Sequence, residues 1–302
     1  GRDRLGDLAH GEPEALGQFE TQYCRGTVFQ QPTGPDQRQK VVLLEPTRVP
    51  LSPQPAAVIP FYHPDLMAGY DLEERAPIAE RPNVQFGRHL AEQGFLVACT
   101  EAYPYNTVPE PDSDEGFAWW QAATDRLLAD NPGWTGIGKL TWDTSRAVDL
   151  LLAQPDVDSE RVVAMGHSLG GKMSFYAAAF DERITACITS DFGIAWDFTN
   201  WDAPWYFGEQ IRDDDFTLNG HHALALIAPR SFLCIAGEAD RPASWHYISE
   251  AQRVYRVYDR ERAAGCFLHM TGHRPTEEAI RTACRWLNEQ FGLPEREWSL
   301  DA

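Results

Sequence analysis

The stretch RVVAMGHSLGG, residues 161–171, decides the fold class of this chain. Its first five residues form a short apolar run that predicts a buried strand, and residues 172–180 predict a helix of little polar character. The pattern Gly-x-Ser-x-Gly lies between them, where the glycines permit a sharp turn without a side-chain collision. Such a turn exposes the Ser168 hydroxyl at the strand end, in front of the free N–H groups of the following helix. The stretch therefore predicts a nucleophilic serine between a strand and a helix.

Short apolar runs alternate with helical patterns over the rest of the chain, as a sheet with crossover helices requires. Strands are predicted at residues 41–44, 56–61, 95–100, 161–165, 184–189, 231–236 and 266–270, and helices at residues 84–93, 115–129, 140–152, 172–180, 245–258 and 279–291. The strands from residue 56 onward are nearly continuous apolar runs, as expected when helices cover both faces of a parallel sheet. We therefore predict an α/β fold with a mostly parallel sheet flanked by helices.

The length of 302 residues allows two domains, but α/β chains of this size also form one domain around one core. We predict one catalytic domain at residues 40–302 and an N-terminal segment, residues 1–39, that packs on its core by adding edge strands or wrapping the sheet. One stretch, about residues 191–228, is too long for an ordinary connection. It contains the aromatic residues Trp196, Phe198, Trp201, Trp205, Tyr206 and Phe207. This stretch is predicted to be a lid-like insertion.

The charge of the chain argues against some classes of partner. With 26 basic and 45 acidic side chains, the formal net charge is −19, which disfavours nucleic acid and anionic membrane surfaces. No run approaches the roughly 20 apolar residues that cross a bilayer. The six cysteines are well separated and are interpreted as buried free thiols. With no apolar signal segment in residues 1–16, these features favour the cytoplasm, although the chain begins with glycine and a removed leader stays open.

The predicted serine needs a base, because an alkyl hydroxyl is a poor nucleophile at neutral pH. In folds with this turn the base comes last along the chain, and of nine histidines only His269 and His273 come that late. His269 lies inside the apolar run 266–270, where a packed histidine is expected. His273 lies in a loop after that run, between Gly272 and Arg274. We predict His273 as the general base and keep His269 in reserve.

A carboxylate must orient that base, and the order along the chain puts it between the serine and the histidine. The strand at residues 231–236 is followed by Gly-Glu-Ala-Asp, which ends at Asp240. A carboxylate just past this strand can reach the imidazole, so Asp240 is the predicted acid. Asp191, at the end of the preceding strand, and Glu238 are its competitors. Asp240 would otherwise be a turn or capping residue.

Two backbone N–H groups should stabilise the oxyanion. The first is the N–H of Leu169, directly after the serine, and the second should come from the loop after the strand at residues 56–61. Pro64 in that loop cannot donate, which leaves Tyr62 or His63, and we favour Tyr62. His63 is alternatively a substrate contact or a polar residue at the strand end.

Further aromatic, histidine and acidic residues are candidates for binding substrate or metal. Trp205 and Tyr206 are predicted to contact substrate, because aromatic side chains often wall binding pockets, although they would also serve to pack the insertion onto the sheet. The adjacent His221 and His222 lack accompanying cysteines or carboxylates at a metal-binding spacing, so we predict no metal. The acidic run 213–215 is interpreted as a hydrated turn.

At residues 166–171, 237–240 and 272–273, the sequence resembles the α/β-hydrolase superfamily, and within it the dienelactone-hydrolase-like esterases and acetyl esterases. The resemblance extends from about residue 41 to residue 291. It implies a mostly parallel eight-stranded sheet, an acyl-enzyme mechanism and no cofactor. Dienelactone hydrolases use a cysteine nucleophile at this turn, whereas this chain has Ser168, so ordinary ester cleavage is favoured over dienelactone chemistry.

We therefore expect a serine esterase that acts on small-molecule esters. The resemblance implies small acyl groups such as acetyl, and an aromatic-lined alcohol side suits a sugar or aryl ester. The same three residues would also serve an amidase or peptidase, a lactonase or a thioesterase, and the fold also occurs as a non-catalytic binding module. We expect neither nucleic acid nor a membrane as a partner, and association into a homo-oligomer stays open.

Overall fold

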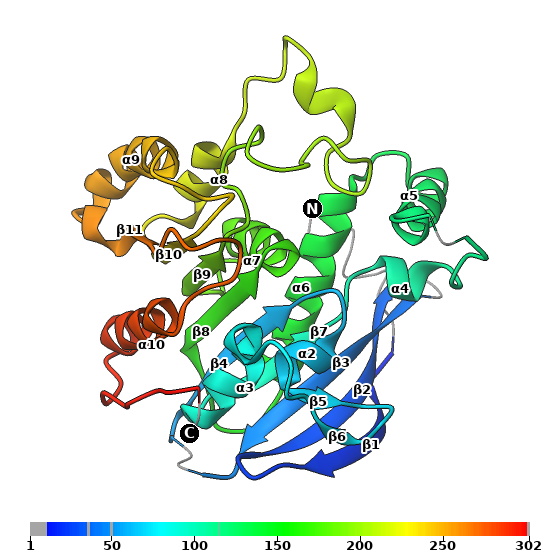
Figure 1. Cartoon of the computed structure of the whole chain (residues 1–302), viewed down its shortest axis with the longest axis vertical. Helices are drawn as coiled ribbons and strands as arrows, with labels where there is room; N and C mark the ends of the chain where they lie inside the picture. Colours follow the sequence, from blue (N-terminus) through cyan, green and yellow to red (C-terminus); the bar gives the residue numbers. More distant parts are fainter. Residues whose placement is uncertain (1–10, 35–36, 49–50, 114, 301–302) are drawn as a thin grey trace.

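A computed structural model describes residues 11–34, 37–48, 51–113 and 115–300, and its centre is a nine-stranded sheet (Figure 1). The strand order is β1-β2-β3-β7-β4-β8-β9-β10-β11. The strands are β1 Glu14–Glu20, β2 Cys24–Gly34, β3 Gln37–Pro46, β4 Gln54–Pro60, β7 Leu96–Thr100, β8 Val157–His167, β9 Ala186–Ser190, β10 Ser231–Ala236 and β11 Ala264–Leu268. The last six strands of that list are parallel to one another. The expected α/β fold is confirmed.

The expected number of eight strands is wrong, because β1 adds a ninth at one edge. β1, β2 and β3 form an antiparallel meander, and β3 pairs antiparallel with β7. Only Phe19 of β1 is buried. The sequence of this strand therefore lacks the alternation of apolar and polar residues by which a strand is predicted. The structure thus places residues 14–34 of the N-terminal segment on the sheet as edge strands, and residues 1–10 of that segment lie outside the described residues.

Helices cover both faces of the sheet, and two separate apolar clusters lie beneath them. One face carries α2 Pro64–Ala68, α3 Phe86–Glu92 and α10 Glu277–Phe291; the other carries α5 Ala118–Asp130, α6 Gly136–Leu152, α7 Leu169–Phe180, α8 Gly220–Ile227 and α9 Ser244–Tyr255. Alternate strand residues enter opposite clusters: Ala56 and Val58 face one, while Ala57 and Ile59 face the other. This double burial explains why the parallel strands contain nearly continuous apolar runs.

The insertion leaves the sheet after β9 and returns to it through α8. In Figure 1 it is the yellow-green segment beyond the strand ends, above α7 and α8. Before α8 it contains the short 3-10 helix η2, Glu209–Arg212, between turns and bends. Trp201 anchors it: its side chain is fully buried, and its indole N–H donates to the Gly193 carbonyl oxygen at 2.7 Å. Trp201 and Phe207 also pack on Tyr176 of α7, with ring centroid distances of 5.6 Å and 5.5 Å, so the insertion rests on that helix.

The buried His89 of α3 should make the fold sensitive to acid. Its Nε2 lies 2.7 Å from the Pro82 carbonyl oxygen, and burial lowers the pKa of His89 to about 3. Between pH 6.5 and 3 the unfolded chain therefore binds a proton that the folded chain does not, so stability falls as the pH falls through this window. We expect His89→Gln to reduce the loss of unfolding free energy between pH 6.5 and 5 by about 2 kcal/mol, measured by urea unfolding.

The control for this experiment is His246→Gln, because His246 is exposed. It should leave the loss of unfolding free energy between the two pH values unchanged. Equal losses in wild type and His89→Gln would mean that His89 does not set the acid sensitivity.

Candidate active site

The predicted serine lies at a strained turn between β8 and α7. Ser168 has φ 54° and ψ −115°, a conformation that non-glycine residues rarely adopt, and its N–H donates to the Ser190 carbonyl oxygen at 2.7 Å. The neighbouring positions must be glycine, because a side chain there would collide with the backbone. A Cβ at Gly166 would lie 2.1 Å from backbone atoms of Gly170, and one at Gly170 would lie 2.1 Å from the Pro60 carbonyl oxygen. The turn therefore presses the start of α7 against the end of β4.

The second predicted residue, His273, lies in the loop after β11 and is paired with Asp191. The distance from His273 Nδ1 to Asp191 Oδ2 is 2.5 Å. The other carboxylate oxygen of Asp191 accepts backbone N–H groups of Gly237, Glu238 and Asp240 at 2.9–3.0 Å. Burial raises the pKa of Asp191, but the hydrogen bonds from His273 and from this loop outweigh burial and lower it. Asp191 is therefore an ionised, immobilised partner of the imidazole.

The prediction that Asp240 orients His273 is thus contradicted by the geometry, and the competitor Asp191 takes that position. Asp240 is fully buried and turns away from the imidazole toward the chain after β9. Its carboxylate accepts the N–H groups of Phe192 and Gly193 on one oxygen, and the N–H of Ile194 on the other, at 2.8–2.9 Å. Its role is to hold the backbone that follows Asp191. Glu238, the other competitor, contributes its backbone N–H to Asp191.

The two carboxylates therefore hold each other's loops. Asp191 binds the backbone of residues 237–240, and Asp240 binds the backbone of residues 192–194. The Ser244 hydroxyl also donates to Asp240, at 3.0 Å. We call this arrangement the reciprocal clamp. It fixes the position of Asp191, and through Asp191 that of His273.

Two further histidines lie near the candidate base. The ring of His167 lies 4.6 Å from that of His273, and its Nδ1 lies 3.1 Å from the Ser190 hydroxyl. Burial, and secondarily the proximity of His273, lower the pKa of His167 to about 3, so this ring is neutral. His269, the reserve base, lies just past β11, and its Nδ1 lies 2.9 Å from the Thr271 hydroxyl. The structure therefore gives His269 a local partner within its own loop.

The serine and the histidine share one small cavity of about 80 Å³. Its lining is Tyr62, Phe117, Trp120, Ser168, Leu169, Lys172, Asp191, Phe192, Thr199, Asn200, Trp205, Tyr206 and His273. The predicted contact residues Trp205 and Tyr206 are thus at the cavity wall. His63 is not among the lining residues; its ring lies tilted against that of Tyr105, with a centroid distance of 4.2 Å.

The candidate oxyanion donors flank this cavity. Leu169 is the first residue of α7, so its N–H has no carbonyl partner within the helix. At the end of β4, the Phe61 N–H donates to the Thr100 carbonyl oxygen at 3.1 Å and is therefore occupied. The next residue, Tyr62, lines the cavity, and in the part of the chain that the structure describes its N–H has no partner. Leu169 and Tyr62 therefore stay the predicted pair.

Lys172 is a cavity residue that sequence reasoning missed. Its side chain is buried, and its Nζ lies 4.4 Å and 4.1 Å from the ring centres of Trp201 and Tyr206. The ammonium donates to the Asn200 side-chain oxygen at 2.9 Å, and burial lowers the pKa of Lys172 to about 7. The sequence does contain a signal for this residue: Lys172 lies four residues after the serine, near the start of an otherwise apolar helix.

Metal ligands do not gather in the described part of the chain: no group of three or more histidine, cysteine, aspartate or glutamate side chains is arranged to hold an ion there. The rings of His221 and His222 lie tilted against each other, with their centres 3.9 Å apart. His222 instead accepts the backbone N–H of Asn219, which caps α8. All six cysteines are free thiols, and five of them are buried.

Comparisons with known proteins agree with this fold. The family model for the prolyl oligopeptidase family matches residues 139–254, and that for the dienelactone hydrolase family matches residues 79–193. The solved glucuronoyl esterase from Solibacter usitatus superposes with a TM-score of 0.71 at 19% sequence identity, over 94% of this chain and 89% of that chain. The chain belongs to the α/β-hydrolase superfamily. At this identity the superposition shows the shared fold alone.

Two relatives of this α/β-hydrolase are similar in sequence. The protein called "Putative hydrolase YtaP" from Bacillus subtilis (strain 168) is 27% identical over 72% of this chain and 73% of its own length. The carbohydrate esterase MZ0003, from an unknown prokaryotic organism, is 25% identical over 58% of this chain. The match spans 46% of the latter protein, which is less than half of its length.

Among the described residues, no helix is long and apolar enough to span a membrane.

Proposed function

We propose that the protein is a serine carboxylic-ester hydrolase that acts through an acyl-enzyme. One observation carries this proposal: Ser168, on its strained turn, shares a cavity with His273, whose Nδ1 is held by the buried Asp191. A nucleophile, a base and an acid that orients the base are the three groups that acyl transfer needs. The similarity to a carbohydrate esterase supports the same class of reaction.

In the proposed mechanism, His273 Nε2 takes the Ser168 proton as the serine oxygen attacks the ester carbonyl. Asp191 holds the Nδ1 proton and stabilises the imidazolium that forms. The N–H groups of Leu169 and Tyr62 donate to the oxyanion. His273 then returns the proton to the leaving alcohol, and a water molecule releases the acyl group by the reverse steps.

The dimensions of the cavity support a small acyl group. A volume of about 80 Å³ lies far below the roughly 300–1,000 Å³ of pockets that enclose a drug-sized ligand. The aromatic walls from Trp120 and Trp205, together with the polar atoms of Lys172 and Asn200, suit the acetyl ester of a sugar or an aryl alcohol. We therefore propose acetyl and similarly short acyl esters as substrates.

This proposal predicts a steep dependence on acyl length. Initial rates on p-nitrophenyl acetate, butyrate and octanoate should fall as the chain outgrows the cavity, with kcat/KM for octanoate at least 100-fold below that for acetate. In parallel, a fluorophosphonate probe should label wild type once per chain and leave Ser168→Ala unlabelled. A protein that neither takes the probe nor cleaves any ester would be a binding module instead.

A second candidate is cleavage of a peptide bond, favoured by the match of residues 139–254 to the prolyl oligopeptidase family model. The same triad would carry it, since the acyl-enzyme is common to both reactions. The p-nitroanilides of short prolyl peptides distinguish the two. Faster cleavage of these anilides than of p-nitrophenyl acetate would favour the peptidase.

A further inference from the structure

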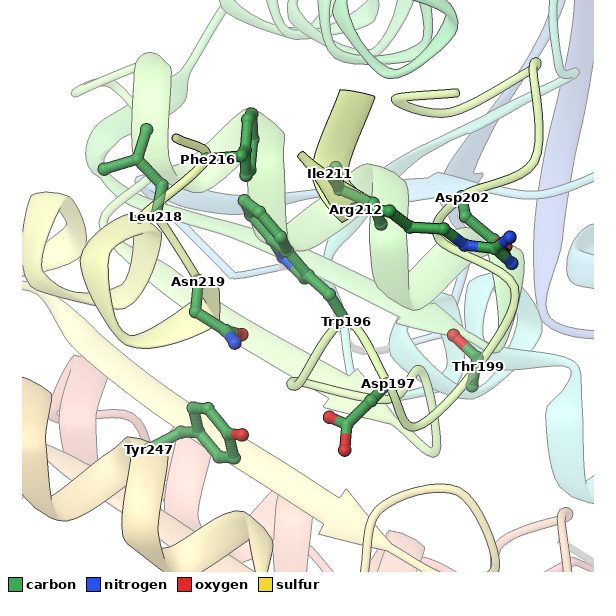
Figure 2. A pocket seen from close by; sticks show the side chains of 10 residues that line it. All are labelled: Trp196, Asp197, Thr199, Asp202, Ile211, Arg212, Phe216, Leu218, Asn219 and Tyr247. Carbon is green, nitrogen blue, oxygen red and sulfur yellow. Dashed lines mark hydrogen bonds and ion pairs between the residues drawn. The ribbon is translucent and has the colours of Figure 1, made fainter. Parts of the chain in front are cut away.

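A second and larger cavity lies in the insertion, beside the catalytic one. Its volume is about 670 Å³, and Figure 2 labels the ten side chains that line it. We call it the insertion cavity; its principal residues are Trp196, Asp197, Thr199, Phe216, Asn219 and Tyr247. Thr199 lines both this cavity and the catalytic one, so the two adjoin.

The volumes of the two cavities suit different parts of one substrate. The catalytic cavity has room for a short acyl group, whereas the insertion cavity falls within the range of pockets that hold ligands of sugar-chain size. A large alcohol attached to an acyl group at Ser168 must therefore extend out of the catalytic cavity. The insertion cavity offers room for this alcohol, because it adjoins the catalytic cavity at Thr199.

An aromatic surface runs through the insertion cavity. Trp196 is half-buried, and its ring is fixed by Phe207 and Phe216, with centroid distances of 5.1 Å and 4.6 Å. In Figure 2 the indole lies at the centre of the lining residues. A rigid indole offers a large contact area at low entropic cost, and the C–H faces of a pyranose ring can stack on it.

Polar atoms surround this aromatic surface. The Asp197 carboxylate and the Tyr247 hydroxyl face the same space below Trp196 (Figure 2), and burial, then the charge of Asp197, raise the pKa of Tyr247. The Asn219 amide lies beside them. The Thr199 hydroxyl oxygen is buried and has no hydrogen-bond partner within the described residues. Such a set matches a ligand that carries several hydroxyl groups, each able to donate and accept.

The charges of the cavity argue against an anion. Asp197 and Asp202 both line it, and the acidic residues 213–215 adjoin it in sequence. The single basic lining residue, Arg212, is engaged in an ion pair with Asp202. A polyanionic chain would thus meet net negative charge, whereas a neutral polyol would not.

We propose that the insertion cavity binds a neutral oligosaccharide, the alcohol part of the ester that Ser168 attacks. This inference rests on the proposed function for the role of the site, but the binding itself is testable without catalysis. Trp196 supplies the stacking surface, and Asp197, Asn219 and Tyr247 bind hydroxyl groups of the sugar.

The first test compares two substrates. Trp196→Ala and Asp197→Asn should each lower kcat/KM for an acetylated xylo-oligosaccharide at least 10-fold while leaving p-nitrophenyl acetate within 2-fold of wild type. Trp245→Ala is the matched control, because Trp245 is exposed on α9 and does not line the cavity. Equal turnover of the oligosaccharide by wild type and both variants would overturn the proposal. Asp197→Asn keeps the test valid if Trp196→Ala fails to fold.

The second test measures binding alone, by calorimetry on Ser168→Ala. Xylotetraose or cellotetraose should bind, and adding Trp196→Ala or Asp197→Asn should weaken binding at least 10-fold. If neither sugar binds at millimolar concentration, or if choline binds in their place in a Trp196-dependent manner, the proposal fails. Sugar binding by a protein that cleaves no ester would refute the proposed function and leave the saccharide site standing.

Discussion

Replacing Ser168 with alanine should lower kcat on p-nitrophenyl acetate by about 10⁶-fold, since removal of the nucleophile in a serine hydrolase of known mechanism has an effect of this size. The alanine keeps the same backbone, because both residues carry a Cβ at φ 54°. What is lost is the oxygen that forms the acyl-enzyme. A residual rate of about 10³–10⁴ over water should remain from the oxyanion N–H groups and substrate binding. The measurement is the initial rate on freshly purified protein, with thermal melting as the check on folding.

A loss below about 100-fold, with folding intact, would contradict the assignment of Ser168 as nucleophile. The matched control is Ser190→Ala. Ser190 lies at the end of the neighbouring strand β9, and its hydroxyl contacts the His167 ring, outside the proposed chemistry. This variant should keep kcat within 10-fold of wild type.

Replacing Asp191 with asparagine should lower kcat by about 10⁴-fold, the second-largest effect we expect. An amide has one oxygen where the carboxylate has two. That oxygen is needed by the backbone N–H groups of residues 237–240, so the NH₂ group would turn toward His273. Facing a donor, His273 Nδ1 must become an acceptor, which puts the ring proton on Nε2 and blocks proton removal from Ser168. The pH-rate profile and kcat on p-nitrophenyl acetate report this change.

Asp240→Asn is the informative companion variant. Asp240 binds the backbone of residues 192–194 and does not contact His273, so its loss should lower the melting temperature and reduce kcat by no more than about 10-fold. The reverse ranking, with Asp240→Asn at 10⁴-fold and Asp191→Asn near wild type, would restore the original assignment of Asp240 as the acid.

Much of this architecture could be predicted because its signals are local. The turn at Ser168 follows from glycines whose side chains would collide with backbone, and a strand before and a helix after it complete the pattern. The central strands are nearly continuous apolar runs, which is typical of parallel strands that helices cover on both faces. His273 could be predicted because it lies in the loop between the last strand and the last helix.

The choice between Asp191 and Asp240 could not be made in the same way. Both follow adjacent parallel strands, β9 and β10, so both carboxylates lie at the same edge of the sheet. Which carboxylate reaches His273 depends on the backbone torsion angles after each strand. Asp191 has a positive φ of 48°, and the sequence around it contains no pattern that predicts this conformation. Lys172 escaped notice for a related reason: its burial depends on the insertion that folds over it, through Trp201 and Tyr206.

The reciprocal clamp also has a consequence for local unfolding. Because each carboxylate is bound by the backbone of the other's loop, neither loop can open without releasing a buried charge in the partner. The amides of residues 192–194 and of Gly237, Glu238 and Asp240 therefore belong to one cooperative unit, whose hydrogen exchange occurs in common opening events. The position of Asp191 and the first residues of the insertion, 192–194, are therefore expected to become ordered and disordered together.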